Sequence, residues 1–172
     1  IAKKKNPNIF FRNVSLKSIK EKNFDLVLSM FNVVNYFKDL KNLIFFFRKI
    51  KNKTSKNSLF IFDAWNGSFN FKSKVVKEKR IIKNKDFILI NHIESIKNPL
   101  SNKVSLNYKI IIDFIKKGKK INIKHQLIQF LWTPNEIKKA LILAGFKSVI
   151  IKRSFTNKSF TKKDLKLIFL AR

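Results

Sequence analysis

Phe24-Asp-Leu-Val-Leu-Ser-Met-Phe-Asn-Val-Val-Asn-Tyr36 and Ser58-Leu-Phe-Ile-Phe-Asp-Ala-Trp-Asn-Gly67 are the two stretches that decide the fold of this chain. Each begins as an apolar run of strand length and ends abruptly in polar and aromatic residues. The segment between them, Asp39 to Lys53, has apolar residues at helical spacing. Apolar strand, helix and apolar strand predict a right-handed crossover between parallel strands of an α/β sheet covered on both faces.

The polar ends of these two strands mark the expected ligand site. In open parallel sheets, ligands bind beyond the carboxyl ends of the strands. We therefore expect Ser29–Tyr36 and Asp63–Gly67 to face a common site.

Two shorter patterns complete the first half of the chain. Ile1–Pro7 is typical of the end of a helix stopped by Asn-Pro, which suggests that the start of the protein is absent. Asn8–Asn13, Phe24–Met30 and Ser58–Asp63 are predicted strands, with a loosely helical connection before residue 24.

The pattern changes at about residue 75. Val104 to Phe114 alternate between apolar and polar residues, and Ile121 to Leu131 return in phase after a Lys-Lys-Gly-Lys turn. Residues 75–132 are therefore predicted to form a four-stranded antiparallel meander, inserted between an α/β core made of residues 1–74 and 133–172. Thr133-Pro-Asn-Glu136 predicts a capped helix start, followed by strands Lys147–Phe155 and Leu165–Ala171.

The charge of the chain first suggests a polyanionic partner. The formal net charge is +29, but 34 of the 39 basic residues are Lys, and they are spread along the whole chain. Lys, Ile, Asn and Phe, all with AT-rich codons, dominate the composition. Specific nucleic-acid readers favour Arg for its bidentate contacts. We interpret the lysines as a solvated coat with nonspecific polyanion affinity.

Several kinds of site are excluded by the residue types. No cysteine is present, so disulfides and thiolate metal sites are impossible, and the wide sequence separation of the two histidines argues against a zinc site. No apolar stretch reaches the roughly 20 residues of a membrane span. We expect a cytoplasmic protein with no metal and no membrane anchor.

The strand ends also resemble a known family. Phe-Asp-x-Val-x-Ser-x-Phe-x-Val-x-Asn-Tyr and Phe-x-Phe-Asp-x-Trp-Asn-Gly resemble the fourth and fifth strands of class I S-adenosylmethionine (SAM)-dependent methyltransferases. Asn8–Ile19 resembles the third strand, with Ser15 where the family has an Asp near the adenine. His125–Phe146 resembles the family's later block ending in Ala-Gly-Phe, without its Arg. The resemblance implies an incomplete, doubly wound Rossmann-like sheet, with SAM as methyl donor.

One family feature is missing. The glycine-rich loop that holds the methionine part of SAM has no counterpart, since the chain has only Gly67, Gly118 and Gly145. We therefore interpret the chain as the later part of such an enzyme. The meander is similar to those of small-molecule methyltransferases, which implies a sugar- or amine-like acceptor.

The resemblance assigns roles to individual residues. Ser15, Leu16, Ser29, Met30 and Phe31 are expected to contact SAM; for Met30 and Phe31 the alternative is ordinary core, and the match to the motif favours contact with SAM.

Acceptor contacts are expected from the strand ends, namely Asn32, Asn35, Tyr36, Asp63, Trp65 and Asn66. Helix capping by Asn35, packing by Tyr36 and a turn at Asn66-Gly67 remain alternatives.

His125 is the candidate base, since the imidazole pKa suits proton abstraction near neutrality. It lies in phase with Ile121, Ile123 and Leu127, so a core histidine is the alternative. His92 is interpreted as structural. The alternative for the whole chain is a noncatalytic basic α/β protein that binds RNA or anionic surfaces.

Overall fold

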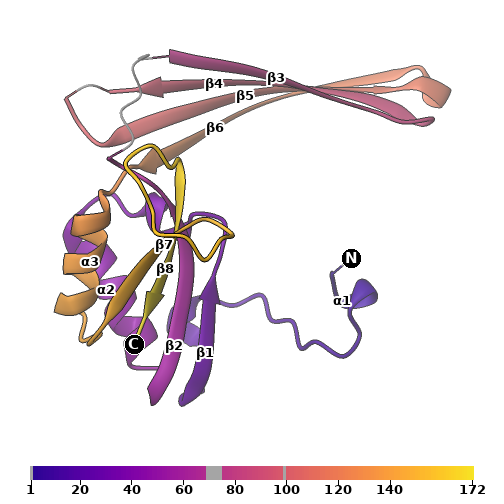
Figure 1. Cartoon of the computed structure of the whole chain (residues 1–172). Coiled ribbons are helices and arrows are strands. Elements are labelled where there is room, and N and C mark those ends of the chain that lie inside the picture. The colour runs from indigo at the N-terminus through magenta and orange to yellow at the C-terminus, as the bar shows by residue number, and fades with distance from the viewer. Residues whose placement is uncertain (1, 69–74, 99) are drawn as a thin grey trace.

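The computed structural model describes residues 2–68, 75–98 and 100–172. Within them the strands form two separate four-stranded sheets (Figure 1). One has the strand order β1-β2-β8-β7 and packs against two helices. The other has the order β3-β4-β5-β6 and lies across one end of the first.

The first sheet combines one parallel pair with two antiparallel pairs. β1 (Phe24–Ser29) and β2 (Thr54–Trp65) are parallel and are connected through α2 (Leu40–Lys51), which confirms the predicted strand–helix–strand unit. β8 (Lys166–Ala171) is antiparallel to β2, and β7 (Val149–Arg153) is antiparallel to β8. The carboxyl ends of β1 and β2 and the start of β8 therefore share one edge of the sheet.

Both long helices begin at the polar residue that the sequence predicts. The carboxylate of Asp39 caps α2 by accepting a backbone N–H bond from its first turn at 2.8 Å. α3 (Pro134–Leu143) starts with the predicted capping box, in which Thr133 and Glu136 each accept a hydrogen bond from the other's backbone N–H. Gly145 follows α3 at φ +98°, a conformation that favours glycine.

The core lies between this sheet and the helices. Phe62 of β2 stacks on Phe169 of β8 with ring centroids 4.9 Å apart, and Phe47 of α2 lies 5.3 Å from Phe62. Burying one such side chain contributes about 1.5–3 kcal/mol. α2 and α3 cover the same face of the sheet (Figure 1). Cover on both faces is therefore a wrong prediction for the described residues, since Ile61 and Leu170 on the opposite face are only half-buried.

The second sheet is the predicted antiparallel meander. Its strands are β3 (Val75–Lys83), β4 (Phe87–Lys97), β5 (Lys103–Phe114) and β6 (Lys119–Phe130), each antiparallel to the next. Its proximal end, where β6 leads into α3, lies against the core. Its distal end, with the turns at 84–86 and 115–118, projects beyond the core (Figure 1).

The N-terminal segment runs away from the core. α1 (Ala2–Lys5) agrees with the predicted helix end, and η1 (Leu16–Ser18) is a single 3-10 turn. The predicted strand Asn8–Asn13 is wrong, because Asn8 and Ile9 lie in a turn and a bend and residues 10–13 pair with no strand. A strand requires a neighbour to satisfy its backbone groups, and no described segment supplies one.

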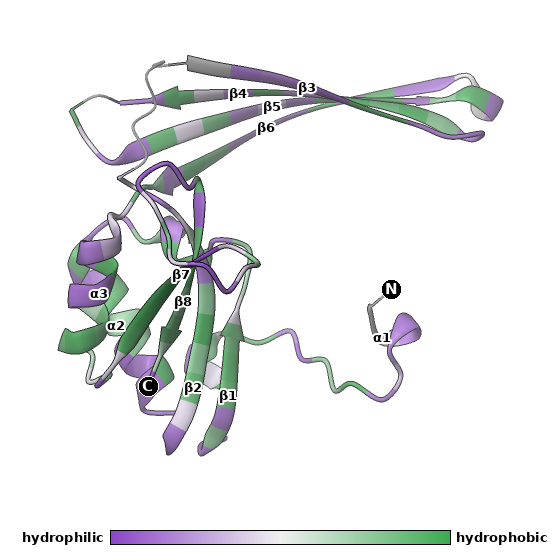
Figure 2. Ribbon diagram, in the orientation of Figure 1, coloured by the Kyte–Doolittle hydropathy of each residue, from purple (hydrophilic) through white to green (hydrophobic). Residues whose placement is uncertain are grey.

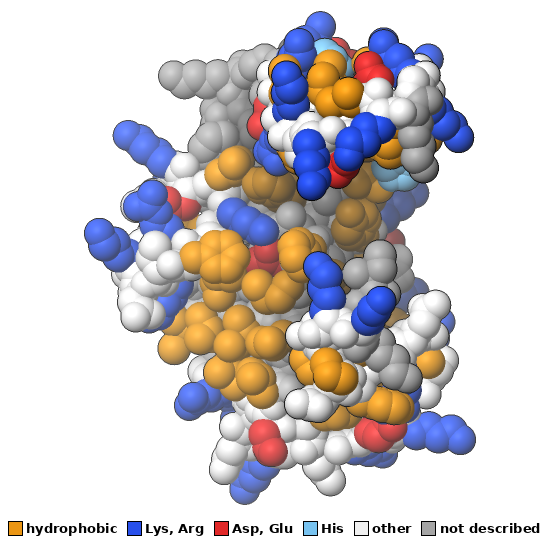
Figure 3. All heavy atoms as spheres, turned by 90° about the vertical axis from the view of Figure 1, so that its right-hand side faces the viewer, with side chains coloured by type: hydrophobic (Ala, Val, Ile, Leu, Met, Phe, Trp, Pro, Cys, Tyr) orange, Lys and Arg blue, Asp and Glu red, His pale blue; other side chains and the backbone are white. Residues whose placement is uncertain are grey.

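β1 forms an apolar edge of the first sheet. Among the described residues only β2 pairs with it, and Phe24, Leu26 and Leu28 are 38%, 52% and 59% exposed. Figure 3 views the molecule from the side of β1 and shows hydrophobic side chains gathered below the meander. An apolar strand edge of this kind normally pairs with a further strand.

Candidate functional site at the carboxyl ends of β1 and β2

The loop after β1 has an unusual backbone. Phe31 and Asn32 both have positive φ, +69° and +58°, in a region that non-glycine residues enter at a cost. The backbone N–H of Asn32 donates to Oδ1 of Asp63 at 2.8 Å, which fixes this conformation. Strained backbone of this kind is concentrated at functional sites because it persists only where surrounding contacts impose it.

Asp63 is the buried anchor of that loop. Its side chain is 1% exposed, and its second oxygen, Oδ2, lies 2.5 Å from Nζ of Lys166. The Lys166 ammonium also lies 5.9 Å from the ring centre of Trp65. The carboxylate therefore joins the ends of β1, β2 and β8, with both oxygens engaged. Lys166 is not predicted from the sequence, because its place follows only from the antiparallel pairing of β8 with β2.

Asn35 connects the loop to the meander. It is fully buried, its Nδ2 donates to the Phe130 carbonyl at 2.8 Å, and its Oδ1 accepts from the Trp65 N–H at 3.0 Å. The alternative role of a helix cap does not apply to Asn35, because its bonds join three separate segments. They hold the end of β6 over the carboxyl ends of the parallel strands.

Asn66 and Gly67 control where the chain leaves the core. The Asn66 amide donates to the Asp164 carbonyl at 2.9 Å, and its oxygen accepts from the Ser68 N–H at 3.0 Å. Gly67 donates to the Trp132 carbonyl at 2.8 Å, and a Cβ at position 67 would come within 2.5 Å of that carbonyl. The exit from the core and the return to it are therefore adjacent.

The expected SAM contacts lie along the β1 side of the site. Ser29 and Met30 are half-buried at the strand end, whereas the Phe31 ring is 85% exposed. Leu16 packs against the edge of the core. Ser15 is exposed, with its hydroxyl 3.0 Å from that of Ser18.

The underside of the meander faces the site. Tyr108 lies beside His125 with ring centroids 6.4 Å apart, and the two residues are paired across β5 and β6. Burial raises the pKa of Tyr108, and the nearby Tyr36 raises it further, whereas Arg80 opposes the shift. Tyr36, Tyr108 and His125 therefore belong to one neighbourhood, although Tyr108 was not predicted.

His125 is not a core histidine. It shares a face with the apolar residues of β6 as predicted, but its side chain is exposed because nothing described covers that part of the sheet. His92 lies on the opposite, outer face, in a cross-strand row with Lys109 and Lys124.

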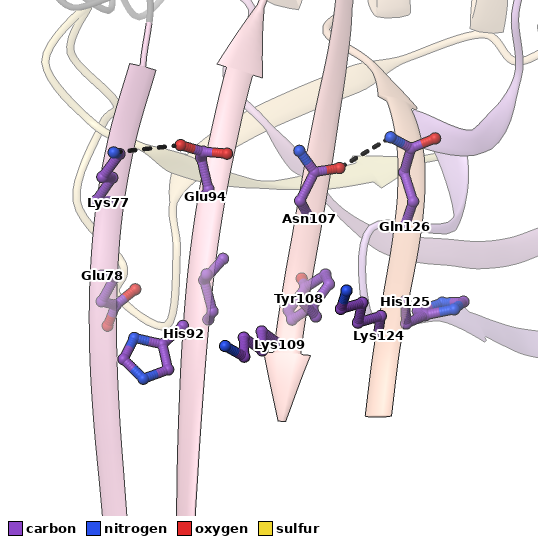
Figure 4. A pocket seen from close by; sticks show the side chains of 11 residues that line it. Lys77, Glu78, His92, Glu94, Asn107, Tyr108, Lys109, Lys124, His125 and Gln126 are labelled. Carbon is purple, nitrogen blue, oxygen red and sulfur yellow. Dashed lines mark hydrogen bonds and ion pairs between the residues drawn. The ribbon is translucent and has the colours of Figure 1, made fainter. Parts of the chain in front are cut away.

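A hollow of about 670 Å³ in the middle of the meander is lined by residues of both faces, among them His92 and Lys109 of the outer face and Tyr108 and His125 of the other (Figure 4). Lys77 pairs with Glu94 at 3.5 Å across it, and Gln126 donates to Asn107 at 2.8 Å.

Two further kinds of site are absent from the described ranges. No group of three or more His, Asp or Glu side chains in them is placed to hold a metal ion. No helix in them is both long and apolar enough to cross a bilayer.

Comparisons with known proteins give structural matches only. No family model matches the chain, and no curated protein matches its sequence. A SAM-dependent methyltransferase from Clostridium acetobutylicum is similar over 92% of this chain and 62% of its own, with a TM-score of 0.71 and 15% identity.

Two further solved structures match almost the whole chain. DesVI from Streptomyces venezuelae matches 99% of this chain and 67% of its own, with a TM-score of 0.80 and 14% identity. A SAM-bound amino pentose methyltransferase from Micromonospora echinaspora matches 99% and 67%, with a TM-score of 0.77 and 10% identity. The chain thus spans about two thirds of the length of these structures. It has the fold of the class I SAM-dependent methyltransferases.

Proposed function

We propose that this chain is the later part of an enzyme that transfers a methyl group from SAM to a small sugar- or amine-like acceptor. The observation that carries the proposal is the fold match over nearly the whole chain, which includes the meander above the strand ends. The exposed edge of β1 and the partial span of the matched structures support the view that further strands complete the sheet.

The residues after β1 fit a bound SAM molecule. The exposed Phe31 ring offers an apolar face, and Leu16 lies at the edge of the nearby core. Oδ1 of Asn32, a residue expected to contact the acceptor, is buried without a hydrogen-bond partner among the described residues. Ser29 and Met30 would line the strand end. Ser15 would contribute only its hydroxyl, since the family's acidic residue is absent there.

The acceptor is proposed to lie between the strand ends and the underside of the meander. Trp65 and Tyr36 would form its walls, with Tyr108 above. Asp63, Asn35 and Asn66 have their polar atoms committed to protein bonds, so we propose that they position this site.

The chemistry requires orientation and one proton acceptor. SAM, when bound, supplies a methyl group on a positively charged sulfur. As the acceptor heteroatom forms its bond to that methyl carbon, the carbon–sulfur bond breaks, and the heteroatom loses its proton. His125 would take up that proton, which is a general-base contribution of about 10²–10⁴-fold.

A calorimetric titration tests the SAM assignment. The 172-residue chain should bind SAM weakly or not at all, because it contains no glycine-rich loop. A version extended by the residues encoded upstream should bind SAM and transfer labelled methyl groups to amines or amino sugars. Micromolar binding of SAM by the 172-residue chain would refute the proposal that part of the SAM site lies outside it. Absence of methyl transfer by the extended chain would refute the proposed function.

The two histidines give a matched test of the base. His125→Ala in the extended protein should lower turnover about 10²–10⁴-fold and leave SAM affinity nearly unchanged. His92→Ala is the control, since it removes the same group from the opposite face of the same sheet. Equal losses in both variants would exclude a specific role for His125.

A further inference from the structure

A hollow of about 440 Å³ lies at the end of the first sheet opposite to the proposed acceptor site. It is lined by Lys51 at the end of α2, by Thr54–Asn57 at the start of β2, by Lys147 before β7 and by Arg172 after β8. We call it the basal hollow. Figure 2 shows β2 hydrophilic at this lower end and hydrophobic above it. None of the residues proposed to contact SAM or the acceptor lines this hollow.

The basal hollow exists because β2 begins before its neighbour ends. The pairing of β8 with β2 stops at Ala171 and Phe60, whereas β2 starts at Thr54. Residues 54–57 therefore extend past the last pair with β8. Arg172 is fixed beside this extension by two backbone hydrogen bonds, of 3.0 and 3.1 Å, to the residue just before β7. The ends of two neighbouring strand pairs thus enclose the hollow from different sides.

The charge that lines the basal hollow is of one sign. Its four ionisable side chains are all cations, Lys51, Lys56, Lys147 and Arg172. None of the four forms an ion pair with any part of the chain that the structure describes. Asp25 accepts a bond from the Ser55 hydroxyl at 3.0 Å but does not itself line the hollow. Like charges gathered around one hollow repel each other, and a bound anion replaces that repulsion with attraction.

Lys51 is held at the hollow by contacts other than charge. Its Nζ lies 5.2 Å from the ring centre of the buried Phe146. The Thr54 hydroxyl donates to the Lys51 carbonyl at 2.8 Å, which joins the end of α2 to the start of β2. A lysine that is already positioned loses less rotamer freedom when a ligand binds, so these contacts prepare it for an anion.

The lining favours a small phosphate-bearing ligand. Ammonium and guanidinium groups are the usual partners of phosphate, and Arg can bind it in a bidentate way. A phosphate group carries roughly −1.5 to −2 charge near neutral pH, so four cations are enough for two such groups. The volume of about 440 Å³ falls within the range of small-ligand pockets, roughly 300–1,000 Å³.

The same lining argues against a nucleic acid. Single-stranded nucleic acids are held by aromatic side chains that stack on bases beside a basic groove. Within the described ranges, no aromatic side chain lines the basal hollow. The Phe146 ring lies beneath Lys51 and is 2% exposed, so it offers no stacking surface.

We propose that the basal hollow binds a small ligand with two linked phosphate groups. The connection between α2 and β2 supplies two of the cations, and the segments before β7 and after β8 supply the other two. This inference is independent of the proposed function, because the hollow lies at the end of the sheet remote from the SAM and acceptor contacts.

Two lysines of the same helix provide the test. Calorimetric titration of the 172-residue chain with inorganic pyrophosphate at physiological salt should show saturable one-to-one binding. Lys51→Met removes a cation but keeps an apolar side chain beside Phe146, and it should raise the dissociation constant about tenfold or more. Lys49→Met is the matched control, since Lys49 Nζ lies 4.7 Å from the ring centre of Phe45, outside the hollow. It should change the constant by less than about twofold.

A second pair of variants tests the opposite wall without altering α2. Lys147→Gln should also weaken pyrophosphate binding about tenfold or more. Lys138→Gln removes the same charge from the exposed face of α3 and should leave the dissociation constant nearly unchanged. Inorganic phosphate should bind the parent chain at least about tenfold more weakly than pyrophosphate, because it engages fewer of the four cations. Circular dichroism would show that the variants are folded.

Four outcomes would overturn the proposal. One is the absence of saturable pyrophosphate binding. Another is equal weakening by Lys49→Met and Lys51→Met, which would mean that the lysine coat binds the anion without a defined site. The third is equal affinity for phosphate and pyrophosphate. The fourth is a single-stranded RNA oligonucleotide that binds more tightly than pyrophosphate and depends equally on Lys51, which would assign the hollow to a nucleic acid.

Discussion

Asn35→Ala is the substitution that most directly tests how the meander is held over the strand ends. It removes the donor to the Phe130 carbonyl and the acceptor for the Trp65 N–H, bonds of 2.8 and 3.0 Å. Each group left unpaired costs about 1–3 kcal/mol. Because Phe130 and Trp65 are only half-buried, water can reach part of this region, and we expect a total loss of about 2–3 kcal/mol.

Urea denaturation measures this loss. With a slope of about 2 kcal/mol per molar, the midpoint should fall by about 1–1.5 M at unchanged slope. Asn57→Ala is the control, since it deletes the same side chain at an exposed position of β2 and should change stability by less than about 0.5 kcal/mol. Equal effects at positions 35 and 57 would refute the bridge between the core and the meander.

Three other predictions concern the two tyrosines, the contact between Gly67 and Trp132, and the net positive charge. Tyr36→Phe leaves Tyr108 as the only tyrosine and should lower the pKa of Tyr108, because it removes the neighbouring phenolate. In a pH titration followed by phenolate absorbance, the single transition of the variant should come at lower pH than the second of the two transitions of the parent chain. The raised pKa of Tyr108 means that the folded chain favours the neutral phenol over the phenolate. The stability of the fold therefore does not depend on this group below the ordinary tyrosine pKa of about 10, and it falls as the pH rises above that value. Gly67→Ala should destabilise the protein by about 1–3 kcal/mol in the same urea assay, since its Cβ would overlap the Trp132 backbone. Nucleic-acid binding should be independent of sequence and should fall steeply with salt in an anisotropy titration, whereas a selective complex at physiological salt would favour the RNA-binding alternative.

The sequence predicts well those elements whose signals are local. A capping box and a C-terminal glycine predict α3, and eleven residues that alternate between apolar and polar predict β5. Both elements form as expected. Asn8–Asn13 has strand composition but no described partner, and composition alone cannot supply one. The single-sided helical cover likewise depends on which segments are present.

The candidate site is less predictable for a different reason. Asp63, Asn35 and Asn66 are polar residues at strand ends, and the sequence indicates that they lie near one another. It does not indicate that their polar atoms bind groups about 30 to 98 residues away in the chain. Lys166 is a related case, since it reaches Asp63 only through the reversed direction of β8.

The hydrogen bond between Gly67 and Trp132 has an evolutionary consequence. The Gly67 nitrogen, where the chain leaves the core, lies 2.8 Å from the Trp132 oxygen, where the chain re-enters it. The residues between them therefore form an insertion whose two ends are adjacent. Closing a longer or shorter insertion between such adjacent points changes the entropic cost only slowly with length. The meander can therefore be lengthened, shortened or replaced while the path of the core is unchanged. An architecture of this kind allows selection to revise what lies above the strand ends without rebuilding the sheet beneath them.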